Sequence, residues 1–409
     1  MARTLTRRGF LSAAAGMGAA VLFGCAGGTD FGQGQAPGEK DQRATVFDRA
    51  QPGDAGGDVL TVLMVGDILV HPSVWKSGEA ADGSRSYDHL FEHVLEDVVA
   101  ADIAMLDQET VLGGDELGLS GYPVFNSPQE IGDAEAAAGF DVVLHANNHV
   151  LDKGMAGIES ELAFWRGSHP EMVVAGMADS AEAAAEVPVL ERNGHRVAVL
   201  NYTANTNGIP LPPAAPWAVR MLDEAQVATD VAAARSAGAQ AIVACPHWGT
   251  EYAAAPDAEQ RRWAQVLADA GADVIMGNHP HVMQPFELVE AADGRSVPVF
   301  WSTGNFVSGQ DRKESMIGSI AQVALRFEGD ACHVEAATLT PLVTNKASAS
   351  AGLTTYKLAD YTEELAAGNG ILANAGGAGF SRQWCVDFCA ERLGDGFDRE
   401  TCVFTAALG

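Results

Sequence analysis

Five segments of the chain share one layout, in which an apolar run leads into a small group of polar side chains. The runs cover residues 59–65, 103–106, 141–144, 241–245 and 273–276. The polar groups that follow are Gly66-Asp67, Asp107-Gln108-Glu109, His145-Ala146-Asn147-Asn148-His149, the segment from His247 to Glu251, and Asn278-His279-Pro280-His281. Short apolar runs bounded by turn residues are typical of buried strands. Because ligands of open α/β sheets bind outside the carboxyl ends of strands, these five ends predict one shared metal site.

Helical periodicity alternates with these strands. Apolar spacing predicts helices over 87–101, 128–138, 223–237 and 257–270, with Ser127 as the N-cap of the second. Asn193-Gly194 lies between two apolar runs and predicts a β-hairpin. Further strands are expected over 297–301, 320–327 and 332–339. The alternation predicts an α/β fold, and the added strands favour two stacked mixed sheets flanked by helices.

Four regions are expected along the chain. Residues 1–25 form an export signal, and residues 26–57 are a flexible tether rich in Gly, Gln, Asp and Pro. The main domain covers 58–345. Residues 346–409 form a cysteine-containing appendage packed on it. Four late cysteines, at positions 332, 385, 389 and 402, allow three disulfide pairings, between which the sequence does not choose.

The first residues carry the features of a twin-arginine export signal. Arg7-Arg8 precedes a short apolar stretch that ends at Cys25, in a segment resembling a lipoprotein cleavage box. Lipidation of Cys25 would anchor the protein on the outer face of the cytoplasmic membrane. Cleavage nearby without lipidation would instead release a soluble secreted protein.

Charge narrows the range of partners. The 409 residues include 54 acidic and 25 basic ones, for a formal net charge of -29. Nonspecific nucleic-acid binding depends on Lys and Arg at phosphates, so this balance argues against nucleic acid as a partner. Anionic substrates would be repelled at long range unless bound cations reverse the local field.

The polar groups contain side chains suited to divalent cations. His279 and His281 flank a single proline, and neutral imidazole is a common ligand of borderline metals. Asn148 offers a neutral oxygen. His149 beside it can bind metal or transfer a proton, with Asp152 either orienting it or capping a turn.

The other strand ends add carboxylates and a further imidazole. Asp67 and His247 are candidate ligands, and Glu109 is a better bridging carboxylate than Asp107. His71 is either a ligand or a polar loop residue. Glu251 is a neighbour of the ligands, a substrate contact or an ion-pair partner. The whole set exceeds the three protein ligands of one catalytic zinc and suits two divalent ions, Mn, Fe or Zn, that activate water and clamp a phosphoryl group.

Several of these polar groups resemble the motifs of a known family. The motifs are Gly66-Asp67, Asn147-Asn148-His149 with Asp152, His247-Trp248-Gly249 with Glu251, His279-Pro280-His281, and Gly304-Asn305-Phe306. They are similar to those of CapA-type poly-gamma-glutamate capsule biosynthesis proteins, within the calcineurin-like metallophosphoesterase superfamily. The resemblance covers about residues 59–345.

The resemblance implies a four-layer α/β/β/α sandwich with a two-metal centre. Asp67 would bind the first metal, Glu109 would bridge, and Asn148 and His247 would hold the second. His279 and His281 would complete the pair, and His149 would protonate the leaving group. Two departures from the motifs concern the first site: Leu69 stands where the superfamily has a His, and Asp107-Gln108-Glu109 replaces Asn-Leu-Glu.

Three functions remain open on the sequence alone. The first is an exported, lipid-anchored metal-dependent phosphoesterase of capsule or cell-envelope polymer synthesis, acting on an anionic polymer or phosphoester beside polyglutamate synthase components. The second is a non-catalytic protein whose metal centre binds polyglutamate carboxylates and tethers or exports the polymer. The third is a general extracellular phosphatase or nucleotidase.

Overall fold

The computed structural model describes residues 4–5, 59–348 and 352–408. Apart from Thr4 and Leu5, the predicted export signal with Cys25 and the predicted tether lie outside the described residues. The described residues all belong to one compact unit. Within the described part, each helix is too short or too polar to cross a membrane.

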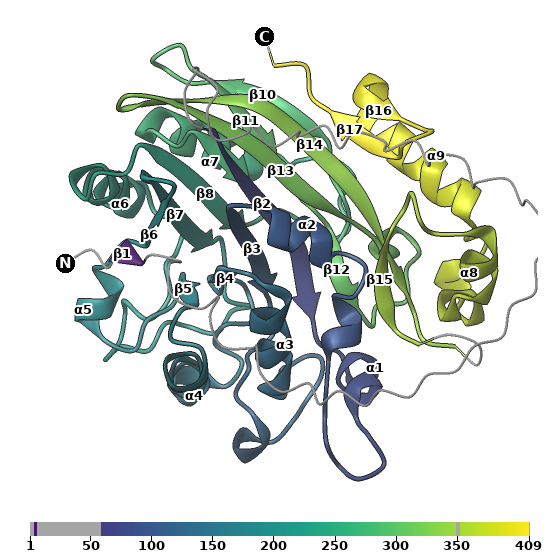
Figure 1. The fold of residues 1–409 in the computed structure, drawn as a ribbon. Helices are drawn as coiled ribbons and strands as arrows, with labels where there is room; N and C mark the ends of the chain where they lie inside the picture. The colour runs from purple at the N-terminus through teal and green to yellow at the C-terminus, as the bar shows by residue number, and fades with distance from the viewer. Residues whose placement is uncertain (1–3, 6–58, 349–351, 409) are drawn as a thin grey trace, which may run out of the picture. The chain divides into compact units, whose positions relative to one another are not determined.

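Two β-sheets form the centre of this unit (Figure 1). The larger has the order β16-β17-β14-β13-β2-β3-β4-β5, with β12 paired to β2 and β15 to β14. Its strands are β2 Val59–Leu69, β3 Ile103–Gln108, β4 Val142–Leu144, β5 Val173–Ala175, β12 Asn305–Ser308, β13 Ile317–Glu328, β14 Ala331–Asn345, β15 Thr354–Lys357, β16 Phe397–Asp398 and β17 Val403–Thr405.

The smaller sheet has the order β1-β6-β7-β8-β9-β11-β10. Its strands are β1 Thr4–Leu5, β6 Val189–Arg192, β7 His195–Thr203, β8 Ala241–His247, β9 Val274–Met276, β10 Phe286–Glu290 and β11 Ser296–Phe300. The helices of the described residues are α1 Pro72–Trp75, α2 Leu95–Ala100, α3 Glu130–Ala138, α4 Gly154–Ser168, α5 Ala181–Ala184, α6 Glu224–Ser236, α7 Ala258–Ala270, α8 Glu363–Gly368 and α9 Arg382–Leu393.

Alternation of side chains along the strands builds four layers. On β2, Val62 and Met64 pack against Val199 and Val243 of the other sheet, in the core between the sheets. Leu63 and its neighbours on the opposite face pack against α2, α3 and α4. The outer face of the smaller sheet is covered by α6 and α7 (Figure 1). Because each sheet buries both faces, the predicted α/β/β/α sandwich of two mixed sheets is confirmed.

Local signals define several of these elements. Helices α6 and α7 begin after Asp223 and Asp257, whose carboxylates accept hydrogen bonds from the first turn. Asn193 and Gly194 both have positive φ, and the strands they join pair in antiparallel register. The predicted hairpin is therefore confirmed, because such turns require left-handed residues at both central positions.

Two expectations of helix shape are wrong. The segment 87–101 is a 3-10 turn, Asp88–Leu90, followed by the short α2, because Phe91 is drawn into a stack with Phe306 at 5.2 Å. Ser127 does not cap α3. Its hydroxyl donates to the Thr110 hydroxyl at 2.9 Å instead, and α3 begins three residues later. In both places tertiary contacts override local propensity.

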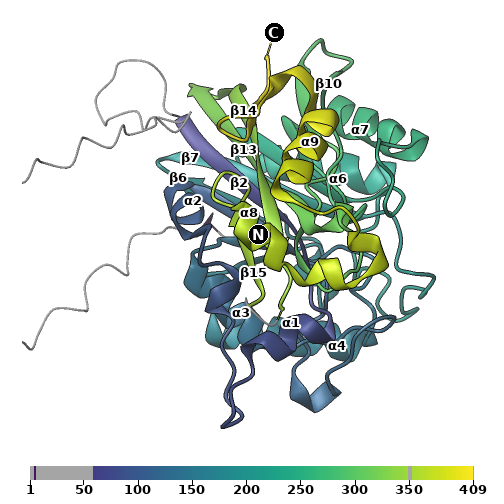
Figure 2. The same ribbon diagram turned by 90° about the vertical axis from the view of Figure 1, so that its right-hand side faces the viewer.

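The segment after 345 extends the larger sheet and its core. β15 and β17 both pair with β14, and α9 packs beside β16 and α8 (Figure 2). Phe388, Cys385 and Cys389 of α9 belong to the same apolar cluster as the core between the sheets. The five cysteines of the described residues are all free thiols, so no disulfide joins them here.

Candidate metal centre

The carboxyl ends of parallel strands from both sheets converge on one group of side chains. β2, β3 and β4 run parallel in the larger sheet, and Asp67 of β2 is in register with Asp107 of β3. β7, β8 and β9 run parallel in the smaller sheet, and His247 bridges to Asn278 across two of their ends. The larger sheet thus supplies carboxylates and the smaller sheet imidazoles.

Gly66 allows the first carboxylate to be placed here. A Cβ atom at this position would lie 1.8 Å from the carbonyl oxygen of Gly304, a distance that no side chain tolerates. The next residue, Asp67, donates its backbone N–H to the same carbonyl at 3.0 Å. The backbone of β2 therefore approaches the segment before β12 closely only because residue 66 lacks a side chain.

Three sets of buried side chains bring their ligand atoms within 4.8 Å of one another. They are Asp67 with Glu109 and His281, Glu109 with His247 and His279, and Asp67 with Asp107 and His247. Glu109 is shared by the first two sets: its Oε2 lies 3.6 Å from His281 Nδ1, and its Oε1 lies 3.7 Å from His247 Nε2. Each oxygen of Glu109 therefore faces a different imidazole.

Asn148 joins the second set. Its Oδ1 lies 3.0 Å from His247 Nε2, and His279 Nδ1 lies 3.1 Å from the same nitrogen. The opposite nitrogen of His247 contacts Asp107 Oδ2 at 2.9 Å. His247 is therefore oriented by one carboxylate while its other nitrogen faces a group of potential ligands.

Several carboxylate oxygens at the centre have no partner. Oδ1 of Asp67, Oδ1 of Asp107 and both oxygens of Glu109 are buried and accept no hydrogen bond. Burial raises the pKa of Asp67, and burial together with the charges of Asp67 and Asp107 raises the pKa of Glu109 well above its usual range. Buried charge without a partner is costly, so the residues fit a cation that would supply the missing contacts.

The imidazoles are also tuned by burial. Burial and the neighbouring His247 hold the pKa of His279 well below its usual value, which favours the neutral ring that binds metal. Burial lowers the pKa of His281 as well, but hydrogen bonding and charge attraction from Asp67 more than offset this, and its pKa is raised. His279 and His281 both have positive φ, at 97° and 58°. Such strain in non-glycine residues is concentrated at functional sites.

His149 lies beside these sets rather than within them. Its Nδ1 is 2.7 Å from Asp152 Oδ2, which also accepts the backbone N–H of Phe125 at 2.6 Å. The edge of the Phe125 ring packs on the imidazole, with centroids 4.8 Å apart. Asn147 Oδ1 accepts the backbone N–H of His149 at 3.0 Å. His149 is thus fixed from three sides.

The remaining predicted residues surround the centre. Asn305 Oδ1 lies 3.1 Å from His281 Nδ1 and helps to orient that ring. His71 belongs to none of the three ligand sets; its Nδ1 lies 3.2 Å from the backbone N–H of Gly309, and burial lowers its pKa to about 4. Glu251 is exposed and takes part in no ion pair among the described residues.

The structure also places residues here that the sequence did not single out. Asn207, in the loop after β7, accepts a hydrogen bond from Asn148 Nδ2 at 3.2 Å, and its own Nδ2 lies 3.4 Å from the His149 ring. It has a positive φ of 52° and precedes Gly208, an Asn-Gly signal at a strand end that could have identified it. Asp107, ranked behind Glu109 from the sequence, belongs to one of the ligand sets.

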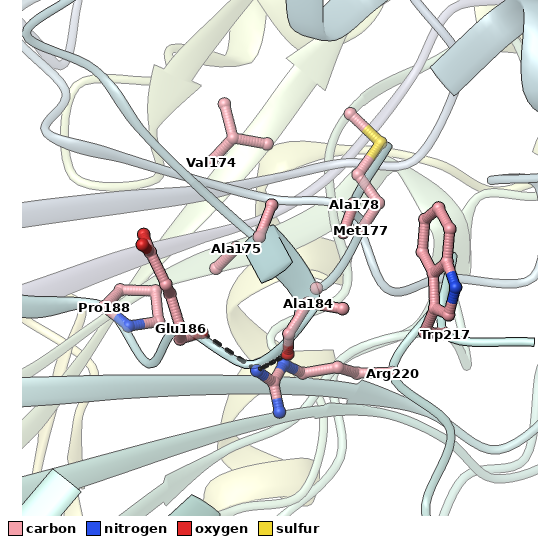
Figure 3. A pocket seen from close by; sticks show the side chains of 11 residues that line it. Val174, Ala175, Met177, Ala178, Ala184, Glu186, Pro188, Trp217 and Arg220 are labelled. Atoms are coloured by element: carbon pink, nitrogen blue, oxygen red, sulfur yellow. Dashed lines mark hydrogen bonds between the residues drawn. The ribbon is translucent and has the colours of Figure 1, made fainter. Parts of the chain in front are cut away.

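A separate cavity of about 40 Å³ lies between β5, α5 and β6 (Figure 3). Arg220 spans it and donates to the carbonyl oxygens of Ala184 and Glu186 at 2.6 and 2.9 Å. Its lining is otherwise mainly apolar, with Met177 and Trp217 on one side. The cavity has room for water only, and no predicted site residue lines it.

Comparison with known proteins finds relatives in capsule synthesis. The chain is 31% identical over 200 residues to "PGA biosynthesis protein CapA" of Bacillus subtilis, covering 46% of this chain and 48% of that protein. It is 29% identical over 288 residues to "Capsule biosynthesis protein CapA" of Bacillus anthracis, covering 66% and 65%. The matches therefore span about half to two thirds of these relatives. "Probable polyglutamine synthesis accessory protein Rv0574c" of Mycobacterium tuberculosis is 30% identical over 284 residues, covering 62% of this chain and 73% of that one.

Likeness to solved structures is distant. The NAD nucleotidase of Haemophilus influenzae superposes with a TM-score of 0.46 at 12% identity, over 73% of this chain and 53% of that one. The sheet order and the four layers described above define the fold instead. The model of the family "Bacterial capsule synthesis protein PGA_cap" matches residues 61–310, well over half of the chain and every ligand candidate named here. The chain belongs to that family of bacterial capsule synthesis proteins.

Proposed function

We propose that this chain is a metal-dependent phosphoesterase of polyglutamate or related cell-envelope polymer synthesis. The observation that carries the proposal is Glu109, whose two unpaired, buried oxygens face His281 on one side and the pair His247 and His279 on the other. A single carboxylate between two such sets fits a pair of divalent ions. The names of the relatives from Bacillus and Mycobacterium supply the polymer context.

Each ion would have its own set of protein ligands. Asp67 and His281 would hold the first and Asn148, His247 and His279 the second, with Glu109 between them. Mixed oxygen and nitrogen donors suit Mn, Fe or Zn. When bound, such ions supply positive charge to a phosphoryl group and lower the pKa of water.

The protein's own acid is His149. Because its Nδ1 faces Asp152, the Nε2 atom is the one from which a proton can pass to a leaving oxygen. Asp152 fixes the ring through its Nδ1 atom, while the Phe125 ring limits its rotation. Asn207 can present an amide hydrogen on the exposed side of the same ring.

The location of the protein completes the proposal. Twin-arginine export and lipidation at Cys25 would hold the domain at the outer face of the cytoplasmic membrane, where polymer leaves the cell. Soluble secretion after cleavage is the alternative. In either location the protein would act beside polyglutamate synthase components and an anionic polymer.

A non-catalytic role is the second candidate, and Leu69 favours it. This side chain is 2% exposed in the core, where a further histidine ligand would otherwise come from the first strand. The first ion is left with Asp67, Glu109 and His281. Weak occupancy of that site would leave a centre that binds polymer carboxylates without hydrolysing a phosphoester.

The two candidates separate in one set of measurements. Purified protein is assayed for bound Mn, Fe and Zn and for phosphoesterase activity with each metal supplied, alongside His149→Ala. The enzymatic proposal expects two ions per chain and loss of activity in the variant. Absence of both metal and activity would overturn it, whereas metal binding with no activity and unchanged polymer production by His149→Ala would favour the binding role.

A further inference from the structure

Arg312 is an exposed cation without an acidic partner. In a chain with more than twice as many acidic as basic residues, most arginines of the described segments form ion pairs, whereas Arg312 forms none within that part of the chain. Its guanidinium carbon instead lies 4.2 Å from the ring centroid of Tyr252. A guanidinium stacked on an aromatic ring keeps its hydrogen-bond donors free in the ring plane.

Tyr252 fixes this cation next to the metal centre. Its ring centroid lies 6.0 Å from that of His281, and its backbone N–H donates to the carbonyl oxygen of Pro280 at 2.7 Å. Tyr252 has a positive φ of 63°. By these two separations the Arg312 guanidinium lies at most about 10 Å from the His281 ring, a distance over which charges still interact at 0.1 M salt.

A chain of hydrogen bonds links the Arg312 loop to the ligands. Gln310 Nε2 donates to the Tyr252 hydroxyl at 3.2 Å, and Gln310 Oε1 accepts from Asn305 Nδ2 at 3.0 Å. Asn305 in turn contacts His281. Lys346 Nζ donates to the carbonyl oxygens of residues 309 and 310 at 3.1 and 3.2 Å. The loop is therefore held in place before any ligand arrives.

The neighbouring cations are already engaged. Lys346 forms an ion pair with Asp311. Lys313 Nζ donates to the Ala378 carbonyl oxygen at 3.0 Å and lies over the ring of Trp384. Arg312 is the cation of this loop whose donors are left for a ligand.

We propose that Arg312, seated on Tyr252, binds a carboxylate of an anionic polymer while another group of the same molecule lies at the metal centre. This inference rests on the proposed function for the polymeric nature of the substrate. A planar guanidinium matches a carboxylate in two parallel hydrogen bonds. It also gives a local attraction where the net charge of -29 would otherwise repel an anion.

The test measures binding of a short γ-linked glutamate oligomer to the full chain by calorimetry, with Mn²⁺ supplied. Arg312→Gln should weaken binding about tenfold, and Arg312→Lys should restore part of it, since a charge-assisted contact is lost and then partly replaced. Arg166→Gln, which removes a charge from the last turn of α4, is the matched control and should bind as the parent does. Tripolyphosphate is the second probe and distinguishes phosphate from carboxylate.

The outcomes separate this inference from the proposed function. Hydrolysis of p-nitrophenyl phosphate, which has no second anionic group, should keep its kcat in Arg312→Gln. Equal oligomer affinity in the parent and in Arg312→Gln, or no oligomer binding by the parent, overturns the Arg312 proposal even where metal and hydrolysis remain. An effect of Arg312→Gln on tripolyphosphate alone overturns the assignment to carboxylate. If the parent neither binds metal nor hydrolyses the ester, the proposed function is overturned. The oligomer measurement still tests Arg312 in that case.

Discussion

Two buried groups of histidine and carboxylate in this protein differ in what their carboxylate oxygens contact. At the end of β4, His145 Nε2 lies 2.6 Å from Glu161 Oε1, and the other oxygen of Glu161 accepts the backbone N–H of Leu112 at 3.0 Å. At the metal centre, by contrast, both oxygens of Glu109 accept nothing. Both glutamates are fully buried.

The difference distinguishes a structural pair from a binding site. Glu161 accepts hydrogen bonds on both oxygens, from Trp165 Nε1 on Oε1 at 3.3 Å and from the backbone N–H of Leu112 on Oε2, so its carboxylate needs no further ligand. Glu109 has histidines nearby on two sides, at distances longer than hydrogen bonds, which leaves space for a cation between them. A buried His–carboxylate group therefore indicates a metal site when its oxygens are left open, not merely when its residue types are suitable.

The largest effect is expected when the pair of His145 and Glu161 is broken. Glu161→Ala leaves His145 buried without its partner and opens a cavity beside Trp165, so the free energy of unfolding should fall by about 3–5 kcal/mol. Urea denaturation measures the change. The folded variant should bind as much metal as the parent; a proportionate loss of metal would show that the two groups are not independent.

Substitution of Glu109, whose oxygens have no partner, should impair function rather than stability. Glu109→Gln should lower phosphoesterase activity more than about 100-fold, since even residues that only orient ligands are worth about 10–100-fold. Metal analysis should show lost ions, while the metal-free variant should be no less stable than the metal-free parent, because an unpaired buried charge is removed. Glu251→Gln, an exposed carboxylate nearby, is the control. Full metal content in Glu109→Gln would contradict the bridging position.

The sequence predicted more of this site than of the elements around it. Strand ends in a doubly layered α/β fold converge by rule, so Asp67, Glu109, His247, His279 and His281 could be grouped from their positions alone. The sequence could not show that His145, within the same polar run as His149, turns away to Glu161, because that pairing depends on α4. Nor could it show the stacking of Arg312 on Tyr252, which depends on the loop after β8.

The prediction of a helix over 87–101 was wrong for a related reason. Helices with strong end signals, such as the capping box of Asp257 with Gln260, begin where the sequence indicates. The segment 87–101 has a helical apolar pattern but packs through Phe91 onto β12, a contact more than 200 residues away in sequence. Apolar periodicity indicates which residues are buried, but it does not indicate which long-range contact determines the backbone conformation.

His149 and Asp152 form a third pair that sharpens the comparison. Their contact is as short as that of His145 with Glu161, but the ring lies beside the open centre. Asp152→Asn should lower kcat by about 10–100-fold with metal content unchanged, because the ring loses the carboxylate that orients it. Steady-state kinetics measure kcat, and metal analysis of the same variant is the control. An unchanged kcat would mean that Asp152 only caps the turn.

The smallest effect concerns Glu135, a buried carboxylate on α3 whose two oxygens also lack partners but which forms no ion pair with a histidine among the described residues. Burial, and then the charge of Glu161, raises its pKa well above 4.5. Folded protein thus keeps a proton that unfolded chain releases, and stability is lost as pH rises above the unfolded value. Glu135→Gln removes this loss, so it should raise the free energy of unfolding by about 1 kcal/mol at pH 7 and by little near pH 4. Denaturation at both pH values measures this, with the exposed Glu159→Gln as a flat control. A gain that is equal at both pH values would mean that the substitution changes packing rather than ionisation. Unpaired carboxylate oxygens would then indicate a functional site only where imidazoles lie beside them.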